Sequence, residues 1–125
     1  PYLYHFPDGN ASIARLLVRR LIPETAPGNS MEDVVTAQFD YRQLDREDSA
    51  VRLRLNSTVV NVEHDGSPTR SNQVGVTYIH AGEAKRVRGR HVVLACYNMA
   101  IPYLCPTIPA HQQQALAQLV KLPLV

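Results

Sequence analysis

The residue types that catalyse hydrolysis or bind metals are present in this chain, but their spacing assembles no site. None of the serines has the flanking glycines of a nucleophile elbow. The five histidines are scattered along the sequence, and we expect each of them on the surface or in the core. The two cysteines, Cys96 and Cys105, form no CxxC pair, and no Cys/His set has zinc spacing. We therefore predict no catalytic residue and no metal site within these 125 residues.

The most unusual local string is Phe6-Pro7-Asp8-Gly9-Asn10. Its simplest interpretation is a turn followed by a helix cap, because Pro-Asp-Gly is a turn signal and asparagine is a good N-cap. The alternative is a backbone approach to a ligand at a helix N-terminus, where free N–H groups favour an anion or a polarised carbonyl. The residues alone favour the first interpretation and leave the second open.

The charged residues give little support for nucleic-acid binding. The formal net charge is +2, and the one basic run alternates with small or apolar residues, as on the solvated face of a strand. That run lacks interleaved aromatic residues, so we expect no nucleic-acid partner. No apolar stretch reaches about 18 residues, so we also predict no membrane span. The basic run consists of Lys85, Arg86, Arg88 and Arg90.

A helix is expected over about residues 10–22. Ile13, Leu16, Leu17 and Leu21 recur at helical spacing, and the arginines fall off that stripe. The helix should stop before Pro23, because proline disfavours the helical conformation of the residue that precedes it.

Period-two alternation then predicts strands over residues 51–55, 58–64 and 74–80, with a hairpin turn near residues 81–83 leading into residues 85–88. Residues 91–96 differ, because they are continuously apolar after His91. Such a run is typical of a strand covered on both faces in a parallel sheet. A last helix is expected over about residues 109–121.

These elements predict an α+β or α/β fragment: an N-terminal helix, an antiparallel strand meander that feeds one buried strand, and a C-terminal helix. The buried strand needs parallel neighbours that the chain does not supply. The chain also begins without methionine and ends on an apolar run, so we expect both ends to be cut from a longer protein. One apolar core is expected to hold Ile13, Leu16, Leu17, Val60, Val62, Val76, Val92, Val93 and Leu94.

The order of these segments resembles the flavin amine oxidase superfamily. The matching segments are the strand at 58–63, the hairpin strand at 74–78, the apolar run at 91–96 and the Ile108-Pro109 pair that begins a helix. The strings at residues 5–11 and 94–106 are similar to the bacterial spermidine dehydrogenase-like branch of that superfamily. The resemblance covers essentially the whole chain.

This resemblance implies part of a two-domain flavoenzyme that oxidises an amine, such as a polyamine, by hydride transfer to FAD. Residues 1–47 would belong to the substrate domain and residues 48–125 to the Rossmann-like FAD-binding domain. Val59 would contact the adenine through its backbone, and Ala95, Cys96 and Tyr97 would lie near the dinucleotide. The family's usual proline after the alanine of the re-entering strand is replaced here by Cys96-Tyr97-Asn98.

The glycine-rich loop that holds the diphosphate is absent from these residues, so the chain alone should bind FAD weakly or not at all. Its expected partners are the remainder of the parent chain and, in the parent, a small amine substrate. Missing sheet neighbours should drive the isolated chain to form a homo-oligomer or to swap an element. The alternative function is a small α+β binding or interaction module without catalytic activity. The two cysteines leave the compartment, cytoplasm or periplasm, open.

Overall fold

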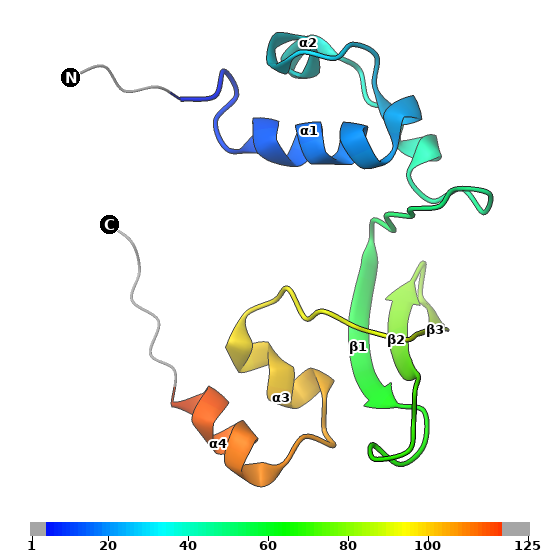
Figure 1. Ribbon diagram of the computed structural model, residues 1–125, viewed down its shortest axis with the longest axis vertical. Coiled ribbons are helices and arrows are strands. Elements are labelled where there is room, and N and C mark those ends of the chain that lie inside the picture. The colour runs from blue at the N-terminus through cyan, green and yellow to red at the C-terminus, as the bar shows by residue number, and fades with distance from the viewer. Residues whose placement is uncertain (1–4, 119–125) are drawn as a thin grey trace. The chain divides into compact units, whose positions relative to one another are not determined.

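A computed structural model describes residues 5–118, which form a small α+β structure with one three-stranded antiparallel sheet (Figure 1). The chain divides into two compact units, Pro1–Leu55 and Asn56–Val125. This division lies eight residues beyond the expected boundary at 47/48, and the assignment of the two parts to a substrate domain and an FAD domain stays a prediction. Within residues 5–118, no helix is long and apolar enough to cross a membrane, as expected.

The first unit is built around helix α1 (Ala11–Leu21) and the shorter helix α2 (Met31–Thr36), which contact each other. Two single turns of 3₁₀ helix, η1 (Pro23–Thr25) and η2 (Tyr41–Gln43), complete it. The prediction of α1 is confirmed, including its stop at Ile22 before Pro23. Asn10 occupies the N-cap position, but its side chain makes no capping hydrogen bond. Asn10 is therefore the N-cap residue as expected, but this cap lacks the side-chain hydrogen bond.

The buried face of α1 is polar, which contradicts the expected core. Ser12 and Arg19 are buried, whereas Ile13 and Leu17 are 41% and 58% exposed. The reason lies in the loop between the helices: the Arg19 guanidinium donates to the carbonyl oxygens of Pro27 (3.3 Å) and Ser30 (2.6 Å). These bonds fix the orientation of the helix and leave its apolar stripe outside. The buried apolar residues of this unit are Ile22, Ala26, Val34 and Leu44.

Residues 51–55, expected as a half-buried strand, form no strand. The Asp45 carboxylate accepts hydrogen bonds from Arg52 Nε (2.5 Å) and Arg54 Nε (2.9 Å), and the Leu53 N–H donates to the Leu44 carbonyl (2.7 Å). The segment is therefore held to the preceding turn instead of to a neighbouring strand.

The second unit contains the sheet, with strands β1 (Ser57–His64), β2 (Val74–His80) and β3 (Glu83–Gly89) in the order β1-β2-β3. All pairs are antiparallel, and the predicted meander is confirmed. The hairpin between β2 and β3 turns on Ala81 and Gly82, which both have positive φ (51° and 81°). Two consecutive residues with positive φ are the geometry of a type I′ turn, and the twist of this turn matches the right-handed twist of the flanking strands.

A β-bulge interrupts β1 between Val59 and Asn61, so that Val60 has no partner of its own on β2. Because successive side chains of a strand point to opposite faces, an extra residue changes which positions are buried. Val62 is buried at 6% exposure, whereas Val60 is 44% exposed. Val62 therefore belongs to the core as predicted, and the placement of Val60 there is wrong.

Residues 91–96, expected as a buried strand, are not a strand in the structure. Val93 is 88% exposed, and Val92 and Leu94 are half-buried. No strand of the described residues pairs with this segment, because the sheet ends at β3. The prediction of a strand covered on both faces is therefore wrong for this structure. The sheet of residues 5–118 is the antiparallel one alone, and a Rossmann-like sheet stays a prediction.

The rest of the second unit is helical and short. A 3₁₀ turn η3 (Asn98–Ala100) leads into α3 (Ile101–Leu104), and α3 contacts β1. Helix α4 (Ala110–Ala117) begins after Pro109, which stands at the N-cap position. The last part of the expected helix, with Leu119 and Val120, lies outside the described residues. Cys105, between α3 and α4, is buried.

Candidate functional site

Val59 lies at the exposed edge of the sheet, beside the β-bulge. Strand β1 pairs with β2 only, so its other side is an edge of this three-stranded sheet. An edge strand leaves about half of its backbone N–H and C=O groups outside the ladder, where a ligand can pair with them. The Val59 side chain is 37% exposed. A bulge at such an edge re-aims backbone groups, and bulges are frequent next to binding sites.

Ala95, Cys96 and Tyr97 lie in the exposed segment that connects β3 with η3. The Tyr97 carbonyl accepts a hydrogen bond from the Ala100 N–H (2.8 Å) and so begins the 3₁₀ turn. Helix α3, four residues further along, contacts β1. After these three residues and the 3₁₀ turn, the chain therefore lies against β1 again, through the contact of α3 with β1.

The two cysteines have different surroundings. Both thiols are free, and Cys96 is exposed whereas Cys105 is buried. Burial raises the pKa of the Cys105 thiol above its ordinary value, with a smaller contribution from Cys96. Cys105 is thus kept as a neutral thiol, which is neither a nucleophile nor a metal ligand in that form. Among the described residues, no three His, Cys, Asp or Glu side chains gather as a metal would require.

One hydroxyl–imidazole pair crosses the sheet. Ser57 and His80 are partners in the register of β1 and β2, and their Oγ and Nδ1 atoms lie 3.1 Å apart. His80 is also the register partner of Glu83 on β3, but the Glu83 carboxylate lies 3.7 Å from the Lys85 ammonium. A catalytic triad needs a carboxylate that orients the imidazole. The Ser57–His80 pair is a cross-strand contact.

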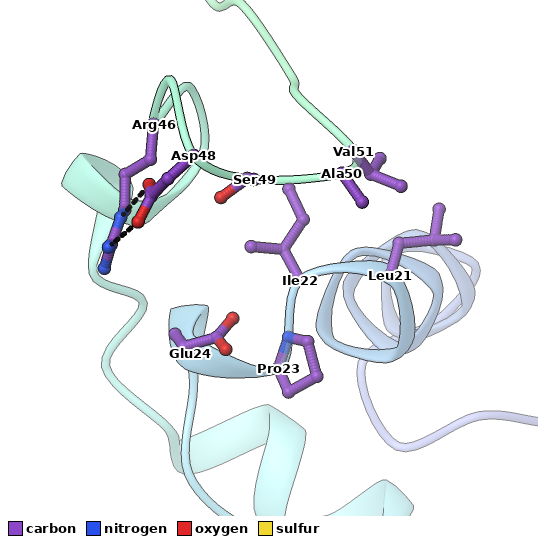
Figure 2. Close-up of a pocket in the computed structure, with 9 residues that line it drawn as sticks. All are labelled: Leu21, Ile22, Pro23, Glu24, Arg46, Asp48, Ser49, Ala50 and Val51. Atoms are coloured by element: carbon purple, nitrogen blue, oxygen red, sulfur yellow. Dashed lines mark hydrogen bonds and ion pairs between the residues drawn. The ribbon is translucent and has the colours of Figure 1, made fainter.

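A pocket of about 310 Å³ lies within the first unit (Figure 2). Leu21 and Val51 form one side of it, and the ion pair between Arg46 and Asp48 forms the other. The Glu24 carboxylate, which comes from η1, also lines it. Its other lining residues are Ile22, Pro23, Ser49 and Ala50.

Arg46 and Asp48, which form an ion pair in this pocket, keep their charges at neutral pH. The hydrogen bond and charge of Arg46 lower the pKa of Asp48, so that both groups are ionised at neutral pH. An ion pair of this kind neither donates nor accepts a proton readily, so it is a poor general acid or base. The charged groups that line the pocket suit the binding of a small polar ligand.

Sequence reasoning missed this convergence, and no local signal could have revealed it. Glu24 is separated from Arg46 and Asp48 by more than twenty residues of loop and short helix. Pairing between such distant positions depends on the course of the loops, which periodicity does not describe.

The chain was compared with known protein families and with curated proteins, and neither comparison finds a match.

Proposed function

We propose that this chain is part of an FAD-dependent oxidoreductase that oxidises an amine, and that β1 supplies the backbone contact to the adenine of the cofactor. The proposal rests on the resemblance of the ordered segments at 58–63, 74–78, 91–96 and 108–109 to the flavin amine oxidase superfamily. The observation that supports it most is the edge position of Val59 beside a bulge, at the head of a strand–hairpin–strand meander.

The residues present fit only the adenine end of FAD. Adenine offers donors and acceptors along its edge, and an edge strand can meet them with N–H and C=O groups. The diphosphate needs a glycine-rich turn at a helix N-terminus, and no Gly-x-Gly-x-x-Gly string occurs in the sequence. When bound, the flavin would accept hydride from the amine. The role of this chain would be to hold and orient the adenine end.

The exposed segment at residues 91–96 would then find its sheet neighbours in the remainder of the parent chain. Its apolar residues, and Val93 above all, would be covered by those strands and by helices of the parent. The isolated chain should accordingly associate or exchange an element, because no strand of residues 5–118 pairs with the outer side of β1 or of β3.

The coding sequence upstream of Pro1 gives the first test. The proposal expects a strand followed by Gly-x-Gly-x-x-Gly and a helix, and it expects the longer protein to be yellow and to bleach when amine is added without oxygen. A longer protein without bound flavin, or the lack of any glycine-rich loop, would contradict it. The isolated 125-residue chain should show no measurable FAD binding. One or two backbone hydrogen bonds at about 1 kcal/mol each cannot offset an association cost of at least roughly 4 kcal/mol.

A second candidate is a binding module without catalytic activity, and one observation favours it. Ile13, Leu17 and Leu21 lie at helical spacing on α1 and are all exposed. Such a stripe is the usual form of a helix that packs against another protein surface. A chain that sediments as a monomer, and whose natural protein contains no flavin, would favour this candidate over the first.

A further inference from the structure

A second hollow, of about 300 Å³, lies within the sheet unit at the end where β1 stops and β2 starts. Most of its lining side chains can donate a hydrogen bond or carry a positive charge. The lining residues are His64, Ser71, Asn72, Gln73, Val74, Arg90 and His91.

The strand register brings these residues together. His64 ends β1 and is the partner of Val74, which in turn is the partner of Gly89 at the end of β3. Arg90 and His91 follow Gly89 directly. A side chain at Gly89 would come within 3.3 Å of the His91 carbonyl, so glycine permits the backbone to stay this close after the strand. Two histidines that are 27 positions apart in sequence thus line one hollow.

Four of the lining side chains have no partner in residues 5–118. Ser71 Oγ donates to the Gln73 carbonyl (2.7 Å) and so serves the loop itself. By contrast, the side chains of His64, Asn72, Arg90 and His91 make no hydrogen bond or ion pair with any described residue. Three of these four can carry positive charge, and the fourth has an amide N–H₂ group.

The acidic groups near the hollow are already paired. Glu63 and Asp65 flank His64 on the chain, and Arg86 Nη1 lies 3.2 Å from the Glu63 carboxylate. Arg88 Nε lies 2.8 Å from the Asp65 carboxylate. Besides Asp65, the charged residue of the loop at 65–73 between β1 and β2 is Arg70. The field in the hollow is therefore positive, because Arg90 keeps its charge and the neighbouring carboxylates of Glu63 and Asp65 are neutralised by their arginine partners.

We propose that this hollow is a binding site for a tetrahedral oxyanion, either a free phosphate or the phosphate group of a larger ligand. Arg90 presents the fork of N–H donors that matches two oxygens of such an anion. His64, His91 and Asn72 donate to the remaining oxygens from the other sides.

The test is a titration of the 125-residue chain, followed by the backbone amide and histidine ring signals in NMR spectra. Sulfate is the first probe, because its charge stays constant between pH 5.5 and 8, and chloride at equal ionic strength is the control. We expect saturable shifts at His64, Asn72, Arg90 and His91 with sulfate, and none with chloride. Inorganic phosphate and phenyl phosphate, compared at one pH, separate a free ion from a phosphate ester as the preferred ligand.

Two variants decide whether the site is specific. Arg90→Ala removes the forked donor and its charge and should weaken sulfate binding about tenfold or more. Arg70→Ala removes an equal charge from the adjacent loop, outside the hollow, and should change the affinity less than about twofold. Equal losses in both variants, or shifts that never saturate, would overturn the proposal. Sheet amide signals that stay in place in both variants verify that the fold is intact.

Discussion

Replacing Arg19 by methionine should loosen the first unit of the chain. In the structure this buried side chain donates from Nη1 to the Pro27 carbonyl (3.3 Å) and from Nη2 to the Ser30 carbonyl (2.6 Å). Methionine keeps the apolar stem that packs against the loop but removes both hydrogen bonds. The loop between α1 and α2 then loses its attachment to α1.

The size of the effect follows from these two bonds. Each hydrogen bond from a charged donor contributes about 1.5–3 kcal/mol. The two acceptors are not fully buried, since Pro27 is exposed and Ser30 half-buried, so water replaces part of each bond. We expect a net loss of about 2–3 kcal/mol, which corresponds to a roughly 30- to 150-fold larger equilibrium population of the open state of the unit.

Native-state hydrogen exchange measures this change residue by residue. Exchange should accelerate at the amides of α1 and α2 and stay unchanged in β1, β2 and β3, because the helices belong to the first compact unit and the strands to the second. Arg20→Met is the matched control, since Arg20 is exposed and has no partner among residues 5–118, and it should shift stability by less than about 0.5 kcal/mol. Equal effects of the two variants would refute the reasoning that a polar anchor orients α1.

Three further predictions concern the same chain. Backbone N–H groups of Asn29 and Ser30 donate to the Asp33 carboxylate and hold its pKa below the ordinary value. The stability that this carboxylate gives α2 is therefore present above about pH 4 and is lost as the pH falls through the lowered pKa. Hydrogen exchange in α2 should show this loss, and Asp33→Asn should remove the pH dependence. A thiol reagent should modify exposed Cys96 quickly and buried Cys105 only when the chain opens, and equal rates would contradict the burial. Gly28→Ala should cost roughly 1–3 kcal/mol by thermal unfolding, because φ is +86° and the new methyl group would lie 2.5 Å from the Asp33 Cβ; an unchanged melting temperature would refute it.

Local patterns predicted α1 and the three strands because those signals are contained in short windows of sequence. The stop before Pro23, the two positive-φ residues at Ala81 and Gly82 and the alternation in β2 need no distant partner. The β-bulge at Val60 had no such signal, and it moved one expected core residue to the surface.

The remaining expectations depended on partners that the sequence does not specify. Arg19 finds its acceptors in a loop eight to eleven residues away, and this reverses the face of α1 that is buried. Residues 51–55 and 91–96 have the apolar content of strands, but a strand also needs a neighbour with free backbone groups. The hollow that holds His64 and His91 arises from strand register, which period-two alternation alone does not fix.

The most direct test of the proposed function is the flavin content of the full-length natural protein with two substitutions at one position. Val59→Pro removes a backbone N–H at the strand edge, and Val59→Ile keeps the backbone and changes only the side chain. We predict that, among correctly folded molecules, the proline variant loses most of its FAD and the isoleucine variant retains nearly all of it. Equal retention, or equal loss, would contradict an adenine contact made by the backbone of β1.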